Sequence, residues 1–387
     1  MKVINTEKIP IKTWDDNSDE KTLEQARELA NMPFAFSHIA LMADSHMGYG
    51  MPIGGVIATH NVVIPNAVGV DIGCGMKARK TNITELDKET LRKILNQIQR
   101  DIPTGFNHQN KPQEISEELM DMTKQLSYDN VAYRRIVNEM PSQMGTLGGG
   151  NHFIELQNGD DGHIWIMLHS GSRGIGKMTC DIYNKMAEDL NSQWYAHKAK
   201  ELAFLPADSA QGMEYLQAMR IGMKFAEENR LHMLEKVTEA IAKFVPDMKV
   251  EEAIDTHHNY ASMENHYGKN VLVHRKGAVR AVGKVIIPGS MGTYSYIAEG
   301  LQNPSSFWSC SHGAGRRMGR KEAVRQLNAQ DVLKDMVNKD IELYKIKKGD
   351  VAEEAWQAYK DIDEVMHNQS DLVKPLVKLR PIGVVKG

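Results

Sequence analysis

The sequence has few cysteines and no long run of apolar residues. Its three cysteines, Cys74, Cys180 and Cys310, are too few in 387 residues for a disulfide framework and favour a reducing compartment. No stretch approaches ~18 consecutive apolar residues, so a membrane-spanning helix is excluded. The first residues, MKVINTEKIPIKTWDD, lack the apolar core of a secretory signal. We therefore expect a cytoplasmic protein without a membrane partner.

The chain also lacks an excess of charge of one sign. Its formal net charge is -3 and its pI is about 6.6, which excludes a protein coated in positive charge. Nucleic acid would have to bind through a local basic patch. Taken alone, each basic segment is better explained as a solvated helix or strand face. The two segments are Arg275, Lys276, Arg280 and Lys284, and Arg316, Arg317, Arg320 and Lys321.

The composition is that of a globular chain with a sizeable core. Hydrophobic residues make up 41% and charged residues 25% of the chain, enough for one large domain or two ordinary ones. Apolar residues recur at helical spacing in four segments: 86–102, 177–204, 214–245 and 320–343. Strand-like runs occupy residues 54–65, 163–168, 270–274 and 281–289.

Glycine and histidine cluster beside these strands, in residues 44–76, 144–176, 254–294 and 309–319. Loops that follow strands are where sites are usually built. No linker rich in proline, glycine or serine divides the clusters, so one domain over residues 1–387 is more economical than two. We predict an α+β fold: a single large mixed domain with central β-sheets, a helical hairpin inserted at about 177–245, and a metal and nucleotide site built from glycine-rich loops.

The segment VGVDIGCGM (68–76) places a carboxylate and a thiol on one tight loop. Asp71 and Cys74 are three residues apart, and the glycines around them allow turns that a Cβ would forbid. The two side chains can bind a common metal ion. A buried cysteine in a glycine-rich turn is the alternative.

Histidines follow a glycine run and a strand in two further segments. His152 and Glu155 stand three residues apart after the glycines of MGTLGGGNHFIEL (144–156). An apolar strand ends on His169, well placed for a metal ion or a substrate, and Arg173 in the next loop can hold a phosphate through two hydrogen bonds. The alternative for His152 is a structural histidine whose ring forms its hydrogen bonds within a turn.

A phosphate-binding P-loop is not favoured in the same region. Residues Gly171–Lys177 fit the pattern G-x-x-x-x-G-K, but Met178 stands where that motif requires serine or threonine. The nearest hydroxyl is displaced to Thr179, so the magnesium ligand of a P-loop is out of place.

Three more segments carry histidines or small polar residues: IDTHHNYAS (254–262), PGSMGTYSY (288–296) and SCSHGAGRRMGR (309–320). Adjacent side chains on a strand point to opposite sides, so at most one of His257 and His258 reaches a given site. Small residues after His312 let a bulky phosphate approach its ring. A loop histidine without a chemical role is the alternative for His312.

Together these segments predict a metalloenzyme that acts on a phosphorylated substrate. A thiolate, a carboxylate and three imidazoles suit manganese, iron, cobalt or zinc better than magnesium, and one thiolate can bridge two ions. The spacing matches no short zinc-finger pattern. The candidate ligands are Asp71, Cys74, His152, His169 and one of His257 or His258.

The segments also resemble, in order and over nearly the whole chain, the motifs of the RtcB family of RNA-splicing ligases. VGVDIGCGM, SHGAGR and the C-terminal GVVKG together make the resemblance specific. The sequence departs from many members after Asp44 in its first motif and is short for the family. The matching segments are ADSHMGYGMPIGG (43–55), VGVDIGCGM (68–76), GGGNHFIE (148–155), LHSGSRG (168–174), HHNYA (257–261), VHRKGA (273–278), PGSMGT (288–293), SHGAGR (311–316) and PIGVVKG (381–387).

The resemblance implies two Mn²⁺ ions, bridged by Cys74, and a nucleophilic His312 that accepts GMP from GTP. Of His257 and His258, the resemblance selects His258 as the ligand, because it precedes Asn259 as in the family's His-Asn pair. Arg173 matches an arginine that contacts phosphate of the RNA. The implied metal ligands are Asp71, Cys74, His152, His169 and His258. Positions implied to contact the guanylate are Asn151, His152, Phe153, Ile154, Glu155, His258, Asn259, Pro288, Gly289, Ser290, Met291, Ser295, His312, Gly313, Ala314, Gly315 and Lys386.

The implied activity joins RNA 2',3'-cyclic phosphate or 3'-phosphate ends to 5'-hydroxyl ends, in tRNA splicing or RNA repair. In some organisms the family works with an activating protein, archease; we expect a monomer, with the need for archease open. A metal phosphodiesterase that only opens cyclic ends would need the metal ligands but not His312. A nonenzymatic RNA-binding module would bind RNA in a salt-dependent way, indifferent to chelators. A paralogue that caps or repairs 3'-phosphate ends is a third alternative.

Overall fold

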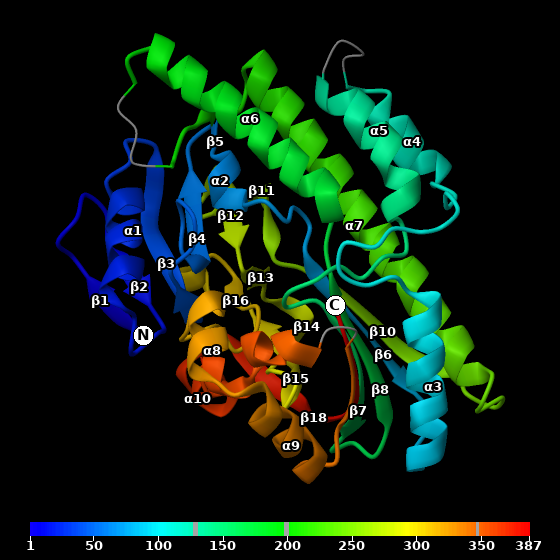
Figure 1. The fold of residues 1–387 in the computed structure, drawn as a ribbon. Helices are drawn as coiled ribbons and strands as arrows, with labels where there is room; N and C mark the ends of the chain where they lie inside the picture. The colour runs from blue at the N-terminus through cyan, green and yellow to red at the C-terminus, as the bar shows by residue number, and fades with distance from the viewer. Residues whose placement is uncertain (127–130, 197–200, 346–347) are drawn as a thin grey trace.

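Two β-sheets form the centre of the molecule in this computed structural model, which describes residues 1–126, 131–196, 201–345 and 348–387 (Figure 1). One sheet has the strand order β1-β2-β3-β4-β12-β11. Its strands are β1 (Lys2–Ile4), β2 (Ile11–Thr13), β3 (Ala35–His46), β4 (Ile53–Thr59), β12 (Lys269–Lys276) and β11 (Asn259–His266).

The other sheet has the order β10-β6-β8-β7-β18-β15-β14, and β17 joins it in parallel to β18. Its strands are β10 (Val250–His257), β6 (Gly75–Thr81), β8 (Ile164–Ser170), β7 (Phe153–Gly159), β18 (Val373–Lys386), β15 (Ser295–Leu301), β14 (Val282–Ile287) and β17 (Glu342–Lys345). Two short ladders pair β13 (Ala278–Arg280) with β16 (Ser309–Ser311), and β5 (Val62–Val63) with β9 (Leu205–Pro206).

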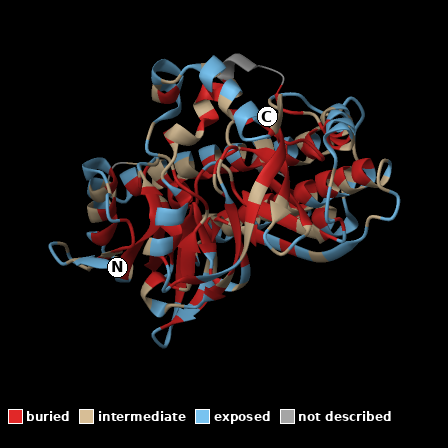
Figure 2. Cartoon of the chain, turned by 90° about the horizontal axis from the view of Figure 1, so that it is seen from below, coloured by how far each residue is buried: buried red, intermediate tan, exposed pale blue. Residues whose placement is uncertain are grey.

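Helices lie on the outside of these sheets, and buried residues concentrate in the strands between them (Figure 2). The long helix α7 packs along α6 and against β6 and β8 (Figure 1). Among the described residues, none of the helices is both long enough and apolar enough to cross a bilayer. The helices are α1 (Glu20–Ala30), α2 (Pro65–Val68), α3 (Lys88–Asp101), α4 (Glu117–Thr123), α5 (Val131–Gln143), α6 (Arg173–Gln193), α7 (Ala210–Ala242), α8 (Arg320–Gln326), α9 (Ala329–Asn338) and α10 (Ile362–Asn368), with 3-10 turns η1 (Pro304–Ser306), η2 (Lys348–Glu354) and η3 (Trp356–Ala358).

The predicted α+β class, the central sheets and the helical hairpin are confirmed. The helix expected at 86–102 is α3, whose Leu91, Leu95 and Ile98 are buried in a core shared with β7, β8 and α7. The strands expected at 163–168, 270–274 and 281–289 are β8, β12 and β14. The single-domain prediction over residues 1–387 stays a prediction.

Three predicted boundaries are wrong. The helix predicted at 177–204 begins earlier and ends at Gln193, since Tyr195 takes a left-handed φ of 52°; residues 197–200 of that prediction lie outside the described chain. The segment 320–343 is two helices, because Asn328 caps α9 with its side chain after α8 has ended, and Glu342 already starts β17. The run 54–65 is β4 and β5, separated by a turn at Asn61 with φ 51°.

Candidate metal centre and catalytic cavity

One edge of the second sheet collects residues that are far apart in the sequence. Strand β6 begins directly after Cys74, and β7 begins directly after His152. Strand β8 ends at His169–Ser170, and β10 ends at His257. The pairing registers Gly75↔Ser170, Phe153↔His169, His257↔Gly75 and Lys386↔Phe153 place all these ends at the same edge.

Potential metal ligands meet at this edge. Among the described residues, ligand atoms of Cys74, His152 and His169 lie within 4.8 Å of one another. The Cys74 Sγ atom is 3.5 Å from His152 Nε2 and 3.2 Å from His169 Nε2. Asp71 Oδ2 is 3.1 Å from His152 Nε2, and His258 Nε2 is 3.4 Å from His169 Nε2. The structure therefore brings together every residue predicted as a ligand.

The two histidines nearest the thiol have their tautomers set by the backbone. His152 Nδ1 lies 2.9 Å from the Leu147 carbonyl oxygen, and His169 Nδ1 lies 3.2 Å from that of Asn151. A carbonyl oxygen only accepts, so each Nδ1 carries the proton and each Nε2 presents a lone pair to the Cys74 sulfur. The two imidazole lone pairs thus face the Cys74 sulfur, with the Asp71 carboxylate beside His152. A metal cation stabilises such an arrangement.

The chemistry of Cys74 also fits a metal ion. Burial, together with the neighbouring Asp71 carboxylate, raises the pKa of the Cys74 thiol well above its usual value. A buried thiolate therefore requires a cation beside it, and a mixed sulfur, nitrogen and oxygen set suits a borderline transition metal. The residues present fit the predicted metal.

Arg230 on α7 lies beneath this centre and ties its loops together. Its side chain is fully buried and donates to the carbonyl oxygens of Gly73 (2.8 Å) and Ser170 (3.1 Å), the neighbours of Cys74 and His169. It also pairs with Asp255 at 3.1 Å and contacts His257 Nδ1 at 3.0 Å. His257 therefore faces Arg230, on the opposite side from the cluster, as alternation along a strand requires.

We expect the substitution Arg230→Met to weaken metal binding about 10- to 100-fold, the usual cost of losing a group that orients metal ligands. The two carbonyls lose their donor, whereas Asp255 keeps Lys77 at 3.0 Å. Titration with Co²⁺, followed through the sulfur-to-cobalt absorption band, measures the affinity. Arg220→Met on the exposed side of α7 is the matched control. An unchanged cobalt affinity in Arg230→Met contradicts this role.

His312 stands at the end of β16, next to the metal ligands and to Asp44 of β3. The His312 and His258 ring centroids are 4.9 Å apart. The fully buried Asp44 Oδ2 lies 2.6 Å from His312 Nδ1 and accepts the backbone amides of His312 (3.1 Å) and Gly313 (3.3 Å). Burial alone would raise the pKa of Asp44, but the charge and hydrogen bond of His312 outweigh it and lower that pKa. Among the residues that the structure describes, none forms a hydrogen bond with His312 Nε2.

Gly315 shows why this loop needs glycine. Its φ is 72°, and a Cβ at this position would lie 2.2 Å from the Asp44 carbonyl oxygen. A side chain would push the His312 loop away from the strand that carries Asp44.

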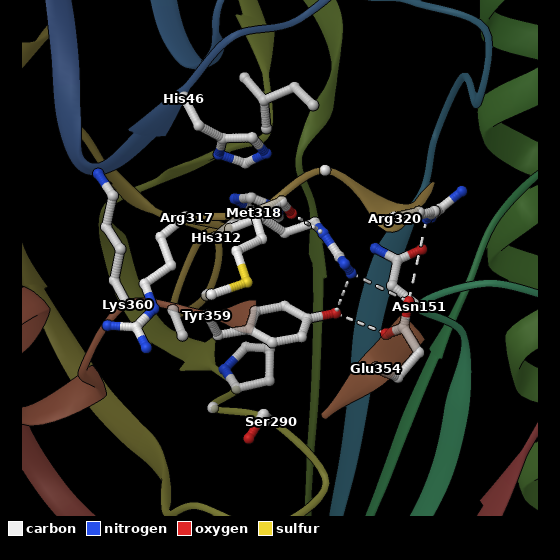
Figure 3. A pocket seen from close by; sticks show the side chains of 18 of the residues that line it. His46, Asn151, Ser290, His312, Arg317, Met318, Arg320, Glu354, Tyr359 and Lys360 are labelled. Atoms are coloured by element: carbon white, nitrogen blue, oxygen red, sulfur yellow. Dashed lines mark hydrogen bonds and ion pairs between the residues drawn. The ribbon is translucent and has the colours of Figure 1, made fainter. Parts of the chain in front are cut away.

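A cavity of about 530 Å³ opens in front of His312 (Figure 3). Its size fits a nucleotide. Residues from both sheets and from the C-terminal strand line it. The predicted residues in its wall are Asn151, Phe153, His169, Pro288, Gly289, Ser290, Met291, His312, Gly313, Ala314, Gly315 and Lys386.

The other residues that were predicted to contact the nucleotide lie behind this wall. Their side chains contact other residues or bond to the backbone. Glu155 is buried against Gln157 (2.6 Å), which also contacts the Ser295 hydroxyl at 3.3 Å. The Asn259 amide donates to the Asp71 carbonyl oxygen (3.0 Å) and accepts from the Gly277 amide (2.8 Å). Ile154 belongs to the hydrophobic core, and His152 and His258 face the metal cluster.

Arg173 lies beside the candidate metal ligands at the start of α6. Its guanidinium donates to the Gly105 carbonyl oxygen at 3.0 Å and to the Thr146 hydroxyl at 3.2 Å, and its φ is 57°. Lys177, the lysine of the P-loop-like sequence, points away and pairs with Asp181 on the exposed side of α6.

Each of the two basic segments is only partly a solvated face: Arg280, Lys284 and Lys321 are exposed, and the other residues are buried or line the cavity. Arg275 is fully buried and pairs with Glu264, and Lys276 is buried against backbone carbonyls. By contrast Arg316, Arg317 and Arg320 line the cavity.

The sequence patterns assign no role to Asp44, which bonds to His312, or to the cavity residues His46, Glu354, Tyr359 and Lys360. Asp44 and His46 belong to the motif ADSHMGYGMPIGG (43–55). Glu354 connects Lys386 (3.2 Å) with Arg316 (3.1 Å). No spacing pattern links position 354 to 386, whereas the motif that contains Asp44 did offer a signal.

Comparison with known proteins gives a consistent match. The family model described as tRNA-splicing ligase RtcB matches residues 25–387. The chain is 37% identical to the RNA-splicing ligase RtcB of Escherichia coli (strain K12), covering 100% of this chain and 99% of the relative. It is 31% identical to the tRNA-splicing ligase RtcB of Thermococcus kodakarensis (95% and 91% covered) and 32% identical to the RNA-splicing ligase RtcB homolog 1 of Entamoeba histolytica (94% and 83% covered).

Proposed function

Because this chain belongs to the RtcB family of tRNA-splicing ligases, we propose that it joins RNA 3'-phosphate ends to 5'-hydroxyl ends through GMP carried on His312. The observation that carries this proposal is the placement of His312. Its Nδ1 is held by Asp44, and its ring stands between a cluster of metal ligands and a nucleotide-sized cavity. A phosphodiesterase that only opens cyclic ends has no use for this arrangement.

The proposed reaction divides one difficult joining step into easier ones. A 2',3'-cyclic phosphate is first hydrolysed to a 3'-phosphate. His312 Nε2 attacks the α-phosphorus of GTP, and pyrophosphate leaves. An oxygen of the RNA 3'-phosphate then attacks the phosphorus on His312 and takes over the GMP. Finally the 5'-hydroxyl oxygen attacks the RNA phosphate, the phosphodiester forms, and GMP leaves.

Asp44 supports the first attack by its position. Its carboxylate accepts a hydrogen bond from the protonated Nδ1, so Nε2 holds the lone pair. The negative charge of Asp44 then stabilises the positive ring that forms when Nε2 bonds to phosphorus. The buried Asp44 Oδ1 has no hydrogen-bond partner within the described parts of the chain.

The metal site is proposed to hold two Mn²⁺ ions. Asp71, Cys74, His152, His169 and His258 would hold these ions, with Cys74 as the shared ligand that the family resemblance implies. When bound, such ions neutralise charge on phosphoryl oxygens. The sulfur and nitrogen ligands favour manganese over magnesium, which prefers oxygen.

Lys386 is proposed to hold the guanine base. Its ammonium group is buried in the cavity wall, 5.6 Å from the Phe153 ring centroid and 3.2 Å from Glu354. If guanine stacks near Phe153, its O6 atom can accept a hydrogen bond from the Lys386 ammonium group. Adenine carries an amino group, which is a donor, at the same position. Arg173, beside the metal cluster, is proposed to bind RNA phosphate.

We expect Lys386→Ala to raise the KM for GTP by at least about 10-fold, the effect of one charge-assisted hydrogen bond of ~1.5–3 kcal/mol. RNA binding, measured by fluorescence anisotropy, should change less than twofold. Lys374→Ala, on an exposed part of the same strand, is the control. A loss confined to RNA binding would refute the assignment of Lys386.

An end-joining assay tests the function. One RNA strand carries a 3'-phosphate, the other a 5'-hydroxyl, and the protein is supplied with GTP and MnCl₂. We expect a joined product that requires GTP and is lost with a chelator. Hydrolysis of cyclic ends without any joining would support the phosphodiesterase instead. The monomeric state, the cytoplasmic location and the need for archease remain predictions.

A further inference from the structure

His46, the last residue of β3, faces the same cavity as His312 (Figure 3). It stands two residues after Asp44 on the same strand. Asp44 supports His312, and His46 is a second imidazole within the same cavity wall. The proposed ligand set and the guanylate contacts make no use of it.

The orientation of the His46 ring leaves one nitrogen free. Its Nδ1 lies 3.0 Å from the Asp44 carbonyl oxygen, which can only accept, so Nδ1 carries the proton. Its Nε2 then bears a lone pair, and no hydrogen bond to it is found within the described part of the chain. Burial, followed by the effect of the nearby His312, lowers the pKa of His46 to about 4 against the opposing pull of its bond to Asp44. Lys360 and Asp44 are the other charged groups that act on this ring. The ring is therefore neutral near pH 7.

We propose that His46 is the general base for the sealing step, taking the proton of the RNA 5'-hydroxyl at Nε2. This inference rests on the proposed function. As the 5'-oxygen bonds to the RNA 3'-phosphorus, the bond from that phosphorus to the GMP oxygen breaks. GMP leaves with the electron pair, and the proton ends on His46.

The chemistry of the other steps makes this role specific. His312 attacks GTP with a ring lone pair, and the RNA 3'-phosphate attacks with an oxygen that already carries negative charge. Neither nucleophile has a proton to lose. Only the 5'-hydroxyl and the water that opens a cyclic phosphate do. A base should therefore matter for sealing and for opening of cyclic ends, but not for transfer of GMP.

A positioning role for His46 makes a different prediction. If the ring merely braced Asp44, its removal would misplace His312 and slow the first attack on GTP. The step that fails thus separates the two roles.

The experiment follows each step with RNA that already ends in a 3'-phosphate, so that opening is bypassed. Wild type, His46→Ala and His46→Gln are compared, with His60→Ala on the exposed turn after β4 as control. Labelled GMP on the protein, RNA carrying a 3'-guanylate, and joined RNA are measured separately. Circular dichroism and thermal melting confirm that each variant is folded.

We expect both His46 variants to label normally, to accumulate guanylylated RNA, and to seal roughly 10²- to 10⁴-fold more slowly, the range for loss of a general base. Added imidazole should restore part of the sealing by His46→Ala. Sealing at the wild-type rate overturns the inference, as does an equal loss of labelling and sealing. A wild type that never carries GMP would instead refute the proposed function.

Discussion

Replacing Cys74 with alanine is expected to abolish metal binding and guanylylation together. The Cys74 sulfur lies 3.2 and 3.5 Å from the Nε2 atoms of His169 and His152, so it is the one atom common to both halves of the cluster. Its loss removes a ligand from each proposed ion. We expect metal affinity to fall by more than the ~10- to 100-fold that follows loss of an orienting neighbour. Equilibrium dialysis with Mn²⁺ and labelling with GTP measure the two effects.

Cys180→Ala is the matched control, because Cys180 is also buried and free but lies on α6 away from the cluster. It should bind metal normally. The raised pKa of the Cys74 thiol also predicts how metal affinity depends on pH. Protons compete with the metal ion for the sulfur, so metal affinity should weaken as pH falls. Guanylylation by Cys74→Ala, or equal support of activity by Mn²⁺ and Mg²⁺, would contradict Cys74 as a bridging ligand.

Asp44→Asn is expected to slow guanylylation of His312 by at least roughly 10²-fold while metal binding stays intact. The amide keeps the shape of the carboxylate and can still accept from the backbone amides of His312 and Gly313. It removes the negative charge that stabilises the ring as Nε2 bonds to phosphorus. In serine proteases the same carboxylate-to-amide change costs about 10⁴-fold in kcat. Single-turnover labelling at saturating GTP measures the rate.

The matched control is Asp16→Asn, an exposed carboxylate that pairs with Lys2. Thermal melting should show Asp44→Asn to be folded. A labelling rate within a few-fold of wild type would mean that Asp44 only holds the His312 loop, without electrostatic assistance. Lost cobalt binding in Asp44→Asn would place the defect in the metal cluster instead.

Sequence patterns predicted the fold class and the neighbourhoods of the site better than the details. Glycine-rich loops beside strands, and residue types that together suit a metal ion, pointed to Asp71, Cys74, His152 and His169 as one site. The choice between His257 and His258 needed either the family resemblance or the structure, which turns His257 toward Arg230. A local sequence pattern shows that neighbouring side chains of a strand point to opposite faces, but it does not show which face carries the site.

Long-range partners were beyond sequence reasoning. Asp44 and His312 are 268 positions apart, and Lys386 and Glu354 come from different elements. Such pairs depend on sheet order and register. The burial of Arg275 and Arg230 was likewise not predictable, because a charged residue is expected to be exposed unless it has a buried partner. In the structure these partners are Glu264 for Arg275 and Asp255 for Arg230.

The measurement that tests the central claim most directly is labelling of the protein with GTP carrying a radioactive α-phosphate, in the presence of Mn²⁺. Wild type and His312→Ala are separated by denaturing electrophoresis, and the labelled peptide of the wild type is identified by mass spectrometry. The account predicts an acid-labile GMP adduct on His312 in the wild type and none in His312→Ala. No adduct on metal-loaded wild type, or an adduct retained in His312→Ala, would contradict it.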